Sequence, residues 1–198
     1  MTKQHDTLID ELIKLLEGGS AHVSLKVAVK GLPAEMRGIV TNKLPYTIWQ
    51  IVEHIRIAQL DMLEFSKDGA HESPKWPDEY WPKEAAPAND AVWRKSIKQI
   101  ESDLEEFVSL MKKSDIYKPI PHGDGQSILR EALQIADHNA YHTAEIGWLI
   151  PCRSLFVACC SESETWLMGH CKLRIPYSKL VSIASSINPR LLREHELP

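Results

Sequence analysis

The sequence has no long apolar run of the kind that a membrane-spanning helix requires. No segment of its 198 residues approaches the roughly 18 consecutive apolar residues of such a helix. The first residues, Met1-Thr-Lys-Gln-His-Asp6, also lack the charged-then-apolar order of a signal peptide. We therefore expect a cytoplasmic protein without a membrane partner.

Clustered positive charge is missing as well. The formal net charge is −4, and the lysines and arginines are scattered along the chain. A surface that binds phosphate backbones needs basic residues gathered on one face or in one stripe. We therefore expect no nucleic-acid partner.

Cysteine is scarce over most of the chain. All four cysteines fall between residues 152 and 171, whereas a disulfide framework would be spread over the fold. Three of them, together with His170, lack the C-x2-C spacing of a zinc module, so we expect no second metal there. These cysteines are Cys159, Cys160 and Cys171.

A convincing strand pattern is also lacking, whereas helical periodicity recurs. Four long segments carry apolar residues at intervals of three and four, which is typical of amphipathic helices. A shorter helical piece, residues 21–30, is expected after a cap at Ser20 and before Gly31. The pattern predicts an all-α protein, a four-helix bundle with one longer connection after its first helix. The long segments are residues 3–17, 46–66, 89–113 and about 126–150.

A long segment between the second and third of these helices cannot be helical in its interior. Residues 68–87 contain four prolines, and loops of this length are often functional. Three aromatic residues in it, Trp76, Tyr80 and Trp81, are candidates either to line a substrate pocket or to hold the loop in place. The sequence leaves both interpretations open.

Two histidines lie one turn apart in the last long helix. His138 and His142 share a face with residues that are otherwise mostly apolar, so both should point into the protein. A buried imidazole needs a hydrogen bond or a metal bond, because leaving it bare costs about 1–3 kcal/mol. A pair on one inward face suggests a metal. The shared face is Ile128, Glu131, Ile135, His138, His142, Ile146 and Leu149.

Four ordered motifs make the chain similar to the DinB-like (DinB/YfiT) family of bacterial metal-binding helical bundles, over about residues 6–148. The motifs are Pro45-Tyr-Thr-Ile-Trp-Gln-Ile-Val-Glu-His54, Ser73-Pro-Lys-Trp-Pro-Asp-Glu-Tyr-Trp-Pro82, Pro121-His-Gly-Asp-Gly-Gln126 and Ala136-Asp-His-Asn-Ala-Tyr-His142. The resemblance implies an up-up-down-down bundle. It also implies a metal held by three histidines, which here are His54, His138 and His142.

Three imidazoles leave coordination positions open, as catalytic rather than structural sites do. Nickel, zinc, iron and manganese all accept imidazole, so the ligands do not identify the divalent ion. Since family members include thiol-dependent transferases, the resemblance implies a metal-dependent transferase or hydrolase acting on a small-molecule substrate, with a low-molecular-weight thiol as partner. The alternative is a non-catalytic small-molecule-binding or stress-response protein whose metal is structural.

Several polar residues near these histidines are further candidates. Asp137, Glu53 and Asp61 are placed to accept hydrogen bonds from the ligating imidazoles, although an exposed helix charge is the simpler interpretation of each. His22 could approach the site, but a surface or capping role fits its position better.

After Pro151 the character of the chain changes. We therefore expect residues 1–150 to form the bundle and residues 151–198 to be a divergent C-terminal extension, or the product of a shifted reading frame. A short helix is expected at residues 188–197. The tail is too apolar to lie free, so it should pack on the bundle or on a second copy of the chain in a homodimer. Its apolar residues include Leu155, Phe156, Val157, Trp166, Leu167 and Met168.

Overall fold

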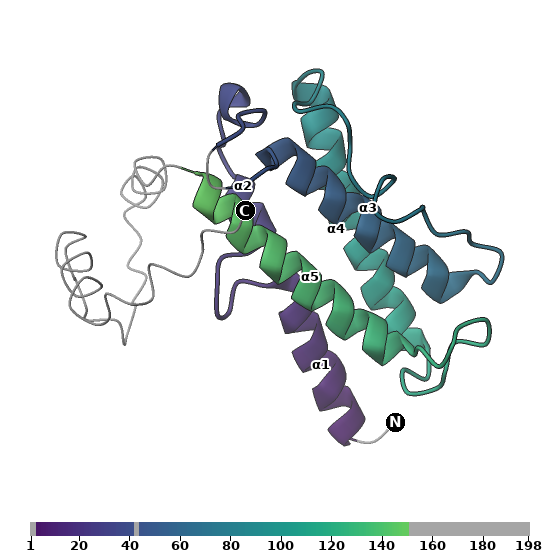
Figure 1. Ribbon diagram of the computed structural model, residues 1–198. Helices are drawn as coiled ribbons and strands as arrows, with labels where there is room; N and C mark the ends of the chain where they lie inside the picture. The colour runs from purple at the N-terminus through teal and green to yellow at the C-terminus, as the bar shows by residue number, and fades with distance from the viewer. Residues whose placement is uncertain (1–2, 42–43, 151–198) are drawn as a thin grey trace, which may run out of the picture. The chain divides into compact units, whose positions relative to one another are not determined.

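A computed structural model describes residues 3–41 and 44–150 of the chain. This part contains five α-helices and one short 3-10 turn, Ala34–Met36, but no strand; two isolated β-bridges are the only strand-like pairings in it (Figure 1). The expected all-α class is therefore confirmed for these residues. The helices are α1 (Lys3–Glu17), α2 (Leu25–Val29), α3 (Ile48–Lys67), α4 (Asp90–Lys113) and α5 (Ile128–Leu149).

Side-chain caps fix where the three longest helices begin. At α3, the Thr47 hydroxyl accepts from the Gln50 backbone N–H, and the Gln50 side chain accepts from the Thr47 N–H. Asn89 caps α4 and Ser127 caps α5 in the same way, through a side-chain oxygen. Each cap satisfies backbone N–H groups that have no partner within the helix.

The short helix α2 differs from the expected piece at residues 21–30. It spans only Leu25–Val29, and its cap is Ser24 rather than Ser20. Either serine side chain can accept a hydrogen bond from a backbone N–H at a helix N-terminus. The two glycines that precede them, Gly18 and Gly19, both have positive φ. The turn that they form ends several residues later than the sequence suggested.

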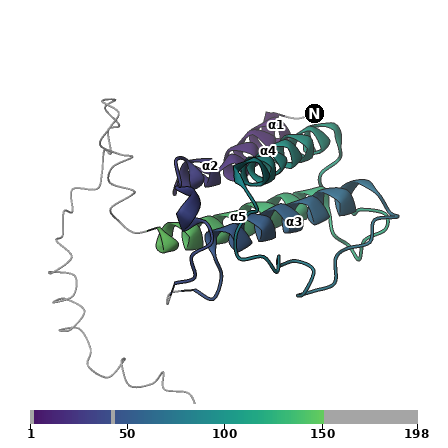
Figure 2. The ribbon, with the colours of Figure 1, turned by 90° about the horizontal axis from the view of Figure 1, so that it is seen from above.

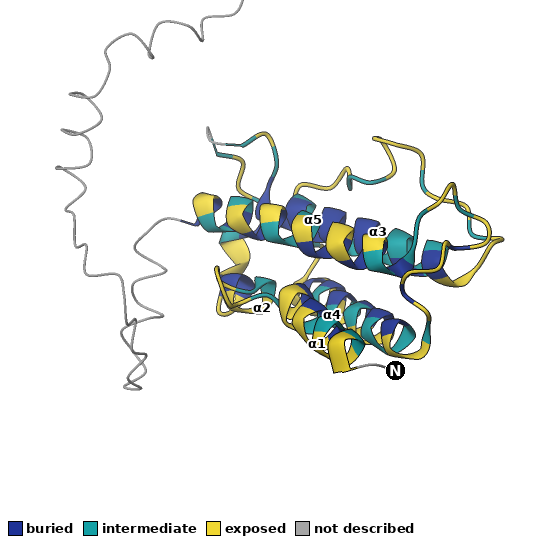
Figure 3. Cartoon of the chain, turned by 90° about the horizontal axis from the view of Figure 1, so that it is seen from below, coloured by how far each residue is buried: buried dark blue, intermediate teal, exposed yellow. Residues whose placement is uncertain are grey.

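The helices lie in two layers. α3 and α5 run side by side in one layer, and α1, α2 and α4 form the other (Figure 2 and Figure 3). Helix α3 contacts α4 and α5, and α1 contacts the same two helices. The predicted apolar faces are the buried ones in Figure 3: on α4 alone, Trp93, Ile100, Phe107 and Met111 are buried.

Helices α3 and α5 are antiparallel. One cluster of buried residues joins Ile48 and Ile51, near the start of α3, to Ile146 near the end of α5. A second cluster joins Leu63, near the end of α3, to Ile135 in the first half of α5. The middle of α3 therefore faces the middle of α5, and this arrangement brings His54 opposite His138 and His142.

The loop from residue 68 to residue 87 runs back along α3 and is held by side chains of that helix. The Thr47 hydroxyl donates to the Ala85 carbonyl at 2.7 Å, and Gln50 Nε2 donates to the Pro82 carbonyl at 3.2 Å. Polar groups on the first turn of α3 thus bond to loop backbone instead of water. The long proline-rich segment is consequently an ordered cover over one side of α3.

In the part of the chain that the structure describes, no helix combines the length and apolar content that crossing a membrane needs. Helix α5 ends at Leu149, with Ile150 as its cap, shortly before Pro151. The expectations for the C-terminal extension, its cysteines and its terminal helix all concern residues 151–198, which lie outside the described residues.

Candidate functional site

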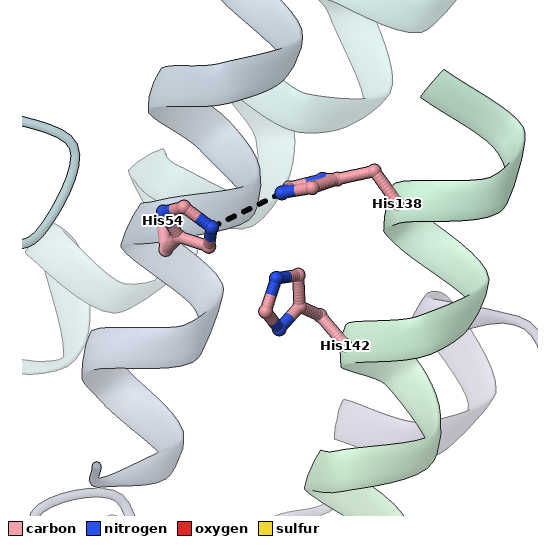
Figure 4. A group of neighbouring side chains, drawn as sticks. All are labelled: His54, His138 and His142. Atoms are coloured by element: carbon pink, nitrogen blue, oxygen red, sulfur yellow. Dashed lines mark hydrogen bonds between the residues drawn. The ribbon is translucent and has the colours of Figure 1, made fainter. Parts of the chain in front are cut away.

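Three histidines meet between the two antiparallel helices. His54 comes from the middle of α3, and His138 and His142 come from successive turns of α5 (Figure 4). One ring nitrogen from each lies within 4.8 Å of the others, so the three could hold a metal ion. His54 and His142 are only 3% and 7% exposed, and His138 is half-buried.

The ring of His54 is fixed on its outer side by the loop over α3. Its Nδ1 lies 2.9 Å from the carbonyl oxygen of Tyr80. A carbonyl can only accept, so Nδ1 carries the proton and donates. The indole of Trp81 stacks on the imidazole at a centroid distance of 3.9 Å, and Tyr46 stacks on the other face of Trp81 at the same distance. The Nε2 atom of His54 is thereby left to face inward.

A chain of amides sets the tautomer of His138. Gln59 Nε2 donates to the backbone carbonyl of Ile100 at 2.7 Å, so Gln59 Oε1 must face Asn139. Asn139 Nδ2 donates to that oxygen at 2.8 Å, which leaves Asn139 Oδ1 facing His138 Nδ1 at 3.3 Å. Because an amide oxygen only accepts, His138 Nδ1 is the protonated nitrogen. Its Nε2 is again the free atom.

His142 has a carboxylate partner. Its Nδ1 lies 2.6 Å from Oε2 of Glu145, which is three residues further along α5. Burial raises the pKa of the Glu145 carboxyl. When this carboxyl is ionised, it accepts a hydrogen bond from the Nδ1–H of His142. The third imidazole then also presents an unprotonated Nε2 to the site.

The facing Nε2 atoms therefore have no proton to share. Those of His54 and His138 lie 3.0 Å apart (Figure 4), yet the Tyr80 carbonyl and the Asn139 amide place the ring protons on Nδ1. Two lone pairs at this separation repel each other unless a cation lies between them. The sequence alone could not show that two lone pairs face each other here, since this depends on the tautomers of both rings.

A proton is a poor candidate for that cation. Burial lowers the pKa of His54, His138 and His142; the like charge of His142 adds to the effect at His138, and that of His54 adds to it at His142. The pKa of His142 falls to about 4. All three imidazoles are therefore neutral at pH 7, which is the form that binds metals.

The donor set fits a divalent transition metal. Two nitrogens that each lie about 2.0–2.1 Å from one ion are separated by about 2.8–3.4 Å at octahedral or tetrahedral angles, and the His54–His138 pair is already at 3.0 Å. The pairs that are further apart have to approach each other to share one ion. Each imidazole already donates from its other nitrogen to an oxygen, which is the usual arrangement behind a metal-bound histidine.

An open cavity of about 550 Å³ adjoins the three histidines. It extends along α3 and α5 and is covered in part by the loop over α3. Of the three loop aromatics, Trp76 and Tyr80 line the cavity, whereas Trp81 packs on His54. Both earlier interpretations of these residues thus hold, each for different members.

None of the three predicted carboxylates accepts a hydrogen bond from His54, His138 or His142. Asp137 is exposed, as the simpler interpretation expected. Glu53 is buried but pairs with Arg56, at 2.9 Å between Oε2 and Nη2. Asp61 lines the cavity and accepts from the Tyr80 hydroxyl at 2.5 Å and from His71 Nε2 at 2.8 Å. Tyr80 thus links it to His54, because the Tyr80 carbonyl accepts from His54 Nδ1.

The partners that the structure reveals were missed, although one had a sequence signal. Glu145 follows His142 by three residues, a spacing that places both on one helix face. The Tyr80 carbonyl is a backbone atom and has no side-chain signature. His22 is exposed and lines a separate cavity of about 410 Å³ bounded by α1, α2, α4 and α5, so it is not part of the site.

Comparisons of this chain with models of known protein families, with curated proteins and with solved structures find no match.

Proposed function

We propose that the chain is a DinB-like four-helix-bundle protein that binds one divalent metal ion through Nε2 of His54, His138 and His142. The observation that carries this proposal is the pair of unprotonated Nε2 atoms that face each other at 3.0 Å. Helices α1 and α3 each contact both α4 and α5, which supports the bundle. The four sequence motifs support the family.

We further propose that the site is catalytic and acts on a small molecule. A divalent ion held by three neutral imidazoles lowers the pKa of a thiol or water that occupies an open position. The protein side contributes the fixed rings: the Tyr80 carbonyl, Asn139 and Glu145 each hold one imidazole in the required tautomer. The adjoining cavity, of about 550 Å³, gives a substrate access. A thiol-dependent transferase or a hydrolase fits this arrangement.

A non-catalytic binding protein is the alternative, and one observation favours it. The carboxyl groups that line the cavity are those of Asp61 and Glu131. Each lies seven residues from the nearest site histidine on its own helix, or about 10 Å along the helix axis. Neither carboxyl is placed beside the histidines to act as a general base there. A purely structural metal fits less well, because the two buried apolar clusters that form the core do not include the histidines.

The test is the metal content of the full chain purified without an affinity tag. We expect one transition-metal ion per chain by elemental analysis after dialysis, and a large loss of bound metal in H54A, H138A and H142A. The matched control is H22A, which removes an exposed histidine outside the site. Full metal content in all three site variants would overturn the proposal.

A further inference from the structure

Two carboxyl groups occupy equivalent positions on the two helices that form the site. Asp61 follows His54 by seven residues on α3, and Glu131 precedes His138 by seven residues on α5. Seven residues are about two helical turns, or about 10 Å along the axis. Because α3 and α5 are antiparallel, the two carboxyls lie at the same end of the shared cavity, and the like charge of Asp61 acts on Glu131.

Glu131 is unusual for a buried acid. The residue is only 6% exposed and lines the cavity, and its carboxyl makes no hydrogen bond or ion pair with the residues that the structure describes. Acidic residues are rarely this buried unless they are paired. Its carboxyl oxygens are not among the fully enclosed polar atoms that lack a partner; they face the open cavity, where a ligand that carries donors can pair with them.

The partners of Asp61 leave it available to the same ligand. It accepts from the Tyr80 hydroxyl and from His71 Nε2, one on each carboxylate oxygen. A carboxylate offers about four acceptor positions, so further donors can be accommodated. Arg130, which is exposed, also lines the cavity, and its positive charge acts on Glu131.

The walls between the two ends combine apolar and polar side chains. Ala58 on α3 and Gln134 on α5 line the cavity between the ends, and Met62 and Phe65 line it beyond Asp61. The loop contributes the rings of Trp76 and Tyr80. The cavity therefore has a group of imidazole nitrogens at one end, a pair of carboxyls at the other, and Ala58, Gln134 and aromatic rings in its walls.

We propose that the cavity takes a bifunctional small molecule that carries an ammonium group, bound by Glu131 and Asp61, about two helical turns from the group that the three-histidine site receives. This inference rests on the proposed metal site. An ammonium brings three donors and a positive charge, which suits two carboxylates and adjacent aromatic rings. Glu131 is thus a specificity-determining residue that contacts the ligand.

The experiment compares thiol probes on the metal-loaded full chain by calorimetric titration under reducing conditions. An aminohexanethiol with its thiol and ammonium at opposite ends of the chain has the two groups at a suitable separation. Hexanethiol lacks the ammonium, and cysteamine has both groups but is too short. We expect wild type to prefer aminohexanethiol over hexanethiol by about tenfold or more, as a charge-assisted hydrogen bond allows. The affinity for cysteamine should not depend on Glu131.

The key variant is Glu131→Gln, which keeps the shape and removes the charge. It should reduce the preference to about threefold or less, while its metal content and its affinity for cysteamine stay at wild-type levels. Glu131→Asp, which retains the charge but withdraws the carboxyl, should give an intermediate preference. The control is Asp10→Asn, which removes an exposed carboxylate from α1 and should leave the preference unchanged.

The outcomes separate this inference from the proposed function. If metal binds but Glu131→Gln keeps the full preference, or wild type has none, the ammonium site is wrong and the metal site stands. If wild type binds no metal, the proposed function fails, and hexylamine and hexanol are titrated into the metal-free protein instead. A hexylamine preference that Glu131→Gln abolishes would support the carboxyl pair by itself, and its absence would overturn the pair as well.

Discussion

Replacement of Glu145 should weaken metal binding in a graded way. Its carboxylate lies 2.6 Å from His142 Nδ1, on the side of the ring opposite Nε2. Removing such a supporting group typically costs about 10–100-fold in metal affinity. Glu145→Ala should therefore lose about 10–100-fold, which corresponds to about 1.4–2.8 kcal/mol. Glu145→Gln keeps a neutral acceptor, and since charge-assisted hydrogen bonds are about twice as strong as neutral ones, its loss should be smaller.

The assay is competition for the metal against a chromophoric chelator at pH 8, where the wild-type carboxyl is ionised. Asp137→Asn is the matched control, because it removes a carboxylate from the same helix beside His138, and that carboxylate is exposed. Its effect should be small. The reasoning is refuted if Glu145→Ala binds metal as tightly as wild type, or if Asp137→Asn weakens binding by as much as Glu145→Ala does.

Four further predictions concern the same site. Burial lowers the pKa of all three imidazoles, to about 4 for His142. Proton competition should therefore leave the metal affinity unchanged just below pH 6.5 and reduce it only as the pH falls toward those lowered values. Metal titrations across this pH range test the prediction. The same shifts make the metal-free fold lose stability as the pH falls below 6.5, because the unfolded chain then binds more protons, and denaturant melts at several pH values measure this. Trp81→Ala should reduce metal affinity by removing the ring that stacks on His54, whereas Trp76→Ala, which removes a 72% exposed side chain, should not; equal effects in chelator competition would contradict this. Chelation should lower the melting temperature without abolishing the helical circular dichroism, because the two apolar clusters that form the core do not include the histidines. Loss of the helical signal would indicate a structural metal.

The sequence predicted the helical scaffold well because its determinants are local. The apolar face that contains His138 and His142 is buried along almost its whole length, and only His138 is half-buried. Asn89 was expected at the start of its helix and does cap α4. The beginning of α2 was wrong because Ser20 and Ser24 are equally good capping residues, and the choice between them depends on the turn through Gly18 and Gly19.

The histidine cluster could be anticipated only in part. Periodicity pointed the pair on α5 inward, but the addition of His54 depended on a family resemblance. The hydrogen bonds behind the rings were beyond reach for a physical reason: the Gln59–Asn139 contact joins residues that are far apart in the chain, and it depends on how two helices pack. Glu131 was part of the predicted stripe, yet only the three-dimensional structure shows that this carboxyl has no partner among the described residues.

Tyr80 touches both ends of the cavity. Its backbone carbonyl accepts from His54 at one end, and its hydroxyl donates to Asp61 at the other. A ligand that drew Asp61 away from this hydroxyl would also alter the loop that orients His54, and the two ends would then be thermodynamically coupled. Coupling of this kind is reciprocal: if bound metal changes the affinity for the ligand by some factor, bound ligand changes the affinity for the metal by the same factor.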